Sequence, residues 1–212
     1  MTGLLQRRTL LVGAAGVAAT LCGARPALAG PQSEEALADA VRSALSAAVT
    51  ASAPPKPAFA KPQDRLDFLR WLGLMSERLQ RKKSESATRI EFLETLWYES
   101  TRAGLEPSLV LGLIQVESGF RKYAVSSAGA RGYMQVMPFW ARQIGDGDPA
   151  RLFHMQTNLR FGCVILRHYL DRERGDNFLG LGRYNGSRGR APYPEAVFAA
   201  RRNWLFDGHL VG

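Results

Sequence analysis

The sequence predicts a mainly α-helical domain, preceded by one further helix and a proline-rich linker. Apolar residues recur every three or four positions along most of the chain after residue 62, which is the period of an amphipathic helix. Proline and glycine stand beside these stretches, where helices commonly begin and end. The composition of 46% hydrophobic, 9% aromatic and 22% charged residues is typical of a globular protein and excludes a largely disordered chain.

Residues 1–29 have the layout of a signal peptide. Arg7 and Arg8 precede an apolar stretch, and a small-residue pattern suited to cleavage ends at Ala29. The adjacent arginines resemble a twin-arginine signal, and a general secretory signal with an incidental arginine pair is the alternative. The apolar stretch is interrupted by glycines and is shorter than the ~20 residues of a membrane span. We therefore expect a bacterial protein that is periplasmic or otherwise exported, with no stable membrane span.

Residues 30–62 form the next predicted unit. From Glu34 to about Ala51, alanines and larger apolar residues recur at helical spacing, which predicts one amphipathic helix. Several prolines between residues 54 and 62 cannot continue that helix and are typical of a stiff linker. We therefore expect a domain boundary at residue 62, with residues 63–212 forming the main domain.

Six helices are predicted in the main domain. They cover about residues 68–79, 92–104, 107–117, 139–144, 157–171 and 194–204. Gly104 suits the left-handed position after a helix, Pro107 suits a first turn, and Thr157 is a typical N-cap. Between Gly119 and Pro138 the helical period is lost, and this segment predicts short strands or a folded loop.

The charge and the cysteines restrict the function classes. The formal charge of +9 falls to +6 when the three arginines of residues 1–29 are removed, and a basic surface suits an anionic polymer. No nucleic-acid-binding motif accompanies this charge, and export would separate the chain from nucleic acid, so we expect no nucleic-acid partner. Cys163 is the single cysteine after residue 29 and lies on a helical apolar face, which predicts a buried thiol. The histidines show no metal-ligand spacing, so we expect neither a metal nor a cofactor.

Glu117 is the strongest candidate for chemistry. Val110, Leu113, Ile114 and Glu117 follow the i, i+3, i+4, i+7 spacing, so the carboxylate falls on the apolar face of its helix. No Lys or Arg of that helix can neutralise it. Burial disfavours the charged form, so we expect a raised pKa and a general acid near neutral pH. The alternative is a helix-terminal Glu that turns to solvent or bonds the nearby backbone.

Four motifs in order give Glu117 its context. They are Glu117-Ser118-Gly119-Phe120, the stretch from Ala130 to Pro138 with Gly132-Tyr133-Met134-Gln135, Asn158-x-x-x-Gly162, and Arg183-Tyr184-Asn185-Gly186-Ser187. In order and spacing they resemble the motifs of lytic transglycosylases related to the soluble Slt enzyme and, more distantly, goose-type lysozyme. The similarity covers about residues 92–205. Each motif alone could reflect packing glycines, core methionines or a turn, whereas the ordered set is specific.

The resemblance implies a lysozyme-like, mostly helical domain that cleaves the β-1,4 bond between N-acetylmuramic acid and N-acetylglucosamine in peptidoglycan. Glu117 matches the catalytic acid/base of that family, and Tyr184 matches a tyrosine whose hydroxyl bonds the catalytic carboxyl. The other matched substrate-binding residues are Ser118, Met134 and Gln135 of the glycan cleft, Asn158 at the start of a supporting helix, and Asn185 at the cleft edge. The chain departs from the family pattern with Tyr133 for Leu, Arg183 for Ala and Tyr193-Pro194 for Tyr-Val, which affects subsite preference more than activity.

The spacing of acidic residues separates two reactions. Conventional glycosidases use two carboxylates, yet no acidic residue follows Glu117 until Asp146. The family resemblance implies a single Glu that protonates the leaving oxygen and then deprotonates the muramic acid 6-hydroxyl, which closes a 1,6-anhydro ring by intramolecular attack. The alternatives are a muramidase that uses Asp146, Asp148 or Asp171, and a catalytically silent murein-binding scaffold. Residues 30–62 are the candidate contact for a cell-wall or secretion-assembly partner.

Overall fold

The computed structural model describes residues 37, 39–50, 57 and 59–208. The predicted signal peptide at residues 1–29 and part of the proline-rich linker lie outside these residues. The described part contains eight α-helices and two short 3₁₀ helices, and its β pairing is limited to two isolated bridges. The prediction of a mainly α fold is therefore confirmed. No helix within these ranges combines the length and the hydrophobicity that a membrane crossing requires.

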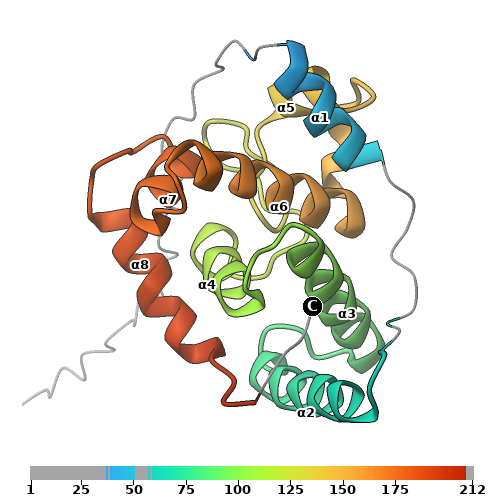
Figure 1. Ribbon diagram of the computed structural model, residues 1–212. Coiled ribbons are helices and arrows are strands. Elements are labelled where there is room, and N and C mark those ends of the chain that lie inside the picture. The colour runs from blue at the N-terminus through green and yellow to red at the C-terminus, as the bar shows by residue number, and fades with distance from the viewer. Residues whose placement is uncertain (1–36, 38, 51–56, 58, 209–212) are drawn as a thin grey trace, which may run out of the picture.

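The helices are α1 (Asp39–Thr50), α2 (Pro62–Leu79), α3 (Ser86–Arg102), α4 (Pro107–Glu117), α5 (Pro138–Ile144), η1 (Pro149–Phe153), α6 (Met155–Arg172), α7 (Asn177–Asn185), α8 (Pro192–Arg201) and η2 (Arg202–Trp204). Figure 1 shows α4 at the centre of the molecule, between α3 and α8 and below α6. All the helices expected from periodicity are present, and α2 begins at the proposed boundary.

The central position of α4 follows from its composition. Pro107 occupies the first turn, and most of the following side chains are apolar around the whole circumference of the helix, a pattern that requires burial on all sides. Val110, Leu111 and Leu113 are fully buried. Gly112 allows the closest contact, because a Cβ there would lie 2.7 Å from the backbone nitrogen of Arg201 in α8. The helix therefore carries its last residue, Glu117, into the interior.

One local expectation is wrong, and one helix was not predicted. The helix α6 begins at Met155, because the carbonyl of His154 already accepts a 2.9 Å bond from the Asn158 amide; Thr157 is therefore inside the first turn and is not the N-cap. The helix α7 was not expected, since Gly180 and Gly182 weaken its helical pattern. Both glycines are required by packing, as a Cβ on Gly180 would lie 2.5 Å from the Leu170 side chain.

The segment between α4 and α5 is a folded loop with two isolated bridges, Val125 to Arg131 and Arg131 to Val136. Asn158 fixes it from α6. The Asn158 Nδ2 donates to the carbonyls of Arg131 and Leu152, each at 2.8 Å, and its Oδ1 accepts from the Met134 amide at 2.8 Å. A buried side-chain amide thus supplies the hydrogen bonds that a sheet would otherwise provide.

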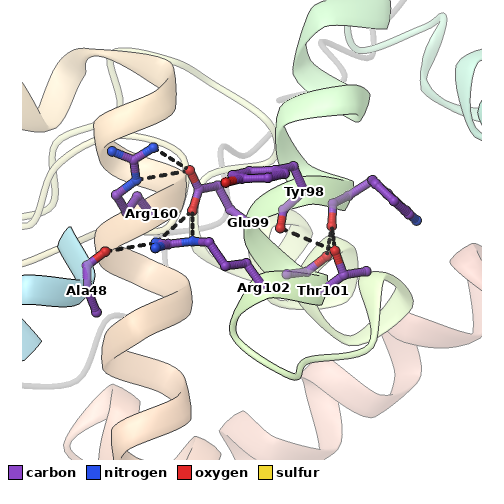
Figure 2. A network of polar contacts seen from close by, with 8 residues as sticks. Ala48, Tyr98, Glu99, Thr101, Arg102 and Arg160 are labelled. Carbon is purple, nitrogen blue, oxygen red and sulfur yellow. Dashed lines mark hydrogen bonds and ion pairs between the residues drawn. The ribbon is translucent and has the colours of Figure 1, made fainter. Parts of the chain in front are cut away.

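A buried ionic network joins three helices (Figure 2). Glu99 of α3 is fully buried, and its Oε1 accepts from Nε and Nη2 of Arg160 in α6 at 3.0 and 2.9 Å. Its Oε2 accepts from Arg102 Nε at 3.1 Å, and Arg102 Nη2 also donates to the carbonyl of Ala48 in α1 at 2.9 Å. The helix α1 is thereby tied to the rest of the chain, and its Leu45 and Val49 join the same core. A domain division at residue 62 stays a prediction.

Candidate active site

Glu117 ends α4 with its side chain inside the protein. The residue is 2% exposed, so the alternative in which it turns to solvent is wrong. Its Oε1 accepts a 2.5 Å hydrogen bond from the Tyr193 hydroxyl, and its Oε2 accepts none from any residue that the structure describes. Burial raises the pKa of Glu117 to about 7, and the bond from Tyr193 offsets part of this rise. A carboxyl with this pKa can both give and take a proton near neutral pH.

Tyr193 lies in the first turn of α8 between Pro192 and Pro194. Its pKa is raised well above the usual value by burial and by the neighbouring charge of Glu117, so the phenol keeps its proton and acts as a donor. In the sequence, Tyr193 stood out only because Pro194 replaces the Val that usually follows this tyrosine. Its bond to Glu117 was not predicted. The available signal was a tyrosine at the start of the last predicted helix, although its partner could not be read from the sequence.

Tyr184 does not make the bond that was expected of it. Its hydroxyl donates to the carbonyl of Met134 at 2.7 Å, and the residue is 1% exposed. The expectation that Tyr184 bonds the catalytic carboxyl is therefore wrong, because Tyr193 makes that bond. The charge of Glu117 nevertheless contributes, after burial, to a pKa of Tyr184 well above the usual value. Tyr184 thus stands near the carboxyl while fixing the backbone of the loop.

The other matched residues surround the loop that follows Glu117. Ser118 is buried, and its hydroxyl donates to the carbonyl of Tyr133 at 2.7 Å. Met134 is fully buried against Gly162, where a Cβ would lie 2.3 Å from the Met134 sulfur. Together with Asn158, these side chains hold the loop from within. A direct contact of any of them with a glycan stays a prediction.

Gln135 is a strained residue next to these supports. Its φ of 50° lies in the left-handed region, which is uncommon for a side chain of this size. Its Nε2 donates to the carbonyls of Ala124 and Gly132 at 3.1 and 2.8 Å, whereas its buried Oε1 accepts no bond from the described residues. Asn185 is buried at the end of α7. Both residues keep their substrate-binding assignment as a prediction.

A carboxylate clamp orients the segment between α7 and α8. Glu173 accepts hydrogen bonds from Arg183 Nε and, at 2.7 and 2.9 Å, from Nε and Nη2 of Arg188. These bonds lower the pKa of Glu173 to about 2. Arg183 precedes Tyr184 directly, and Arg188 lies between Tyr184 and Tyr193, so the clamp holds the chain that leads from one tyrosine to the other. The unusual Arg183 of the sequence motif has a structural role here.

The three candidate second carboxylates are engaged at the surface. Asp146 is half-exposed and pairs with Arg151. Asp148 accepts from the Ala150 amide at 2.9 Å as the N-cap of η1, and Asp171 pairs with Arg167 at 2.7 Å. Within the described ranges, no three His, Cys, Asp or Glu side chains gather as metal ligands would.

Comparison with known proteins identifies the family. Residues 95–201 match the transglycosylase SLT domain, and this range contains both Glu117 and Tyr193. The match spans half of the chain, so the chain belongs to the transglycosylase SLT domain family, which confirms the resemblance seen in the motifs.

The alignments with individual relatives cover shorter stretches of the chain. The membrane-bound lytic murein transglycosylase C of Actinobacillus pleuropneumoniae serotype 5b (strain L20) is 40% identical over 84 residues, which are 36% of this chain and 23% of the relative. The transglycosylase of Enterobacteria phage PRD1 is 33% identical over 102 residues, covering 48% of this chain and 37% of the relative. An X-ray structure of an inactive mutant of the lytic transglycosylase Slt from Pseudomonas aeruginosa is 25% identical, with a TM-score of 0.42, over 69% of this chain and 24% of the other. The chain thus spans well under half the length of these relatives.

Proposed function

We propose that this protein is a lytic transglycosylase that cleaves the β-1,4 bond between N-acetylmuramic acid and N-acetylglucosamine in peptidoglycan, with Glu117 as a single acid/base. The observation that carries the proposal is the buried Glu117 carboxyl, which has one oxygen bonded to Tyr193, the other without a partner among the described residues, and a pKa of about 7. Membership of the SLT family and the similarity to a lytic murein transglycosylase support the substrate class.

The reaction uses the two oxygens of Glu117 differently. Tyr193 holds Oε1, so Oε2 is the oxygen assigned to proton transfer. The protonated carboxyl donates its proton to the glycosidic oxygen, and the bond from that oxygen to C1 of the muramic acid breaks. The resulting carboxylate takes the proton of the 6-hydroxyl, whose oxygen attacks C1 and closes the 1,6-anhydro ring. The carboxyl ends the cycle protonated, as it began, and no water is consumed.

The surroundings of the other carboxylates favour this reaction over hydrolysis. A muramidase of the usual type would need a second carboxylate beside the cleaved bond. Asp146, Asp148 and Asp171 instead make their observed contacts with surface neighbours. The catalytically silent scaffold is disfavoured because the Glu117–Tyr193 pair is intact and poised for proton transfer.

The experiment is mass spectrometry of the soluble products released from purified sacculi by the protein and by Glu117→Gln. Products that end in 1,6-anhydro-muramic acid, absent with the variant, are expected. Reducing-end products would identify a muramidase, and sacculus binding without product release would identify a scaffold.

The remaining proposals concern location and partners. An exported position in the bacterial envelope suits the wall substrate and the signal-like residues 1–29. For residues 30–62, we propose a contact with a cell-wall or secretion-assembly partner through the exposed side of α1, since the opposite side packs on α5 and α6. Loss of partner capture with unchanged cleavage on substitution of the exposed α1 residues Ala40, Ser43 and Ala47 by Glu would support this role.

A further inference from the structure

A groove of about 670 Å³ is lined by none of the residues that surround Glu117. Its walls come from the first turns of α3, from the start and end of the loop after α4, and from the junction of η1 with α6. The residues that give it chemical character are Glu91, Lys122, Tyr123, Tyr133 and Phe153. This combination of aromatic rings and charged groups is typical of a ligand site rather than of a purely structural gap.

Two aromatic rings form one wall. Tyr123 is 71% exposed, more than any other large hydrophobic residue of the described chain. Its ring centroid lies 6.0 Å from that of Phe153, and Lys122 Nζ lies 5.3 Å from the Tyr123 centroid. An exposed aromatic ring beside a charged group suits a sugar, because the C–H face of a pyranose packs on the ring while its hydroxyls reach polar neighbours.

Positive charge lies beside these rings. Lys83 Nζ donates to the Tyr133 hydroxyl at 2.6 Å, and this anchor depends on the tyrosine that replaces the usual Leu of the motif. Burial and the charge of Lys122 both lower the pKa of Lys83, so the two ammonium groups are close enough to repel one another. Neither lysine forms an ion pair within the described chain, and Glu91 is the one acidic residue of the lining. A ligand carboxylate would relieve this repulsion.

We propose that this groove binds a muramoyl unit of the peptidoglycan strand together with a carboxylate of its stem peptide, at a position separate from the bond that is cleaved. The sugar ring packs on Tyr123, and the carboxylate meets Lys122 of the groove lining. The inference rests on the proposed function, because it names a second contact with the same substrate. It also gives the Tyr133 substitution a consequence, since Tyr133 lines the groove and accepts the hydrogen bond from Lys83.

The test is binding to purified sacculi by co-sedimentation, with Glu117→Gln in every sample so that no cleavage occurs. The double variant Tyr123→Ala with Lys122→Gln removes the ring and one charge from an exposed site, so the fold should be unaffected. The matched control is Leu69→Ala with Lys61→Gln, which makes the same kinds of change at exposed positions outside the groove. We expect the groove variant to bind about tenfold more weakly and the control to bind as the parent does.

Equal binding by the groove variant and the control would overturn the proposal. An equal loss of binding to chitin, which is neutral, would also overturn it, because the carboxylate would then be irrelevant. An amidase removes the stem peptides and their carboxylates from the sacculi, so the difference between the groove variant and its parent should shrink after this treatment. An unchanged difference would overturn the assignment of the carboxylate to the stem peptide. Since binding is read without cleavage, a failure of the proposed reaction leaves this result interpretable.

Discussion

The Tyr193 hydroxyl donates a 2.5 Å hydrogen bond to Oε1 of Glu117 and so connects the first turn of α8 with the last residue of α4. The bond opposes the effect of burial on the carboxyl, because a donor to the charged form stabilises that form. The proton affinity of Glu117 is therefore set jointly by the hydrophobic position of α4 and by the placement of α8.

Tyr193→Phe removes this donor and should raise the pKa of Glu117 above about 7. A hydrogen bond to a charged group contributes about 1.5–3 kcal/mol, which corresponds to a shift of roughly one to two pH units. The alkaline limb of the pH profile of kcat should move upward by this amount, because the protonated carboxyl that starts the reaction then persists to higher pH. Tyr184→Phe is the matched control, since its hydroxyl bonds the Met134 carbonyl. A shift in the control that equals the shift in Tyr193→Phe would refute the assignment.

The raised pKa of Glu117 also makes stability depend on pH. The folded protein holds the carboxyl proton up to about pH 7, whereas the unfolded chain releases it near 4.5. Between these values the folded state binds more protons, so stability falls as pH rises, by about 3 kcal/mol in total from this group. Urea unfolding should therefore show Glu117→Gln gaining stability relative to the parent between pH 4.5 and 7. A difference that stays constant over this range would contradict the buried, protonated carboxyl.

Arg188→Gln tests the clamp on the segment between the two tyrosines. The change removes two of the hydrogen bonds to Glu173, and we expect a small loss of stability because Arg188 itself is half-exposed. As the segment leads to Tyr193, kcat should fall severalfold with little change in KM. Arg190→Gln, an exposed neighbour on the same segment, is the control. Equal kinetics for the two variants would show that the clamp does not position Tyr193.

Glu99→Gln should be among the most destabilising conservative changes in the chain. The change removes the Glu99 carboxylate that pairs with the buried Arg160. Breaking a buried ion pair in this way costs about 3–5 kcal/mol of stability. Asp39→Asn is the comparison, because Asp39 and its partner Arg42 are both exposed and such a pair contributes about 0–1 kcal/mol. Chemical unfolding of both variants measures the difference. Similar losses would mean that the network in Figure 2 adds little to stability.

The helical spacing of apolar residues was sufficient to predict most of the helices and the burial of Glu117, because both depend on the local pattern of apolar residues. It failed at α7, where Gly180 and Gly182 lower helix propensity but permit close packing against Leu170 and Arg188. That requirement arises from tertiary structure and leaves no local signal. The start of α6 was misplaced by two residues because the backbone carbonyl of His154, and not a capping side chain, accepts the first helical hydrogen bond.

The motifs identified the family and most residues around the candidate site, but they gave the wrong partner for the carboxyl. Tyr184 and Tyr193 are nine positions apart in the sequence, and both lie near Glu117 in the structure. Which hydroxyl reaches Oε1 depends on how α7 and α8 are placed around α4. This placement depends on the glycine contacts and on the Glu173 clamp, whose partners are far from Glu117 in the sequence.

The most direct measurement is the titration of the Glu117 carboxyl carbon by NMR, with Glu117→Gln used to identify its signal. We expect a midpoint near pH 7, in agreement with burial opposed by the bond from Tyr193. A midpoint near the ordinary value of 4.5 would contradict the assignment of Glu117 as a general acid that is protonated at neutral pH.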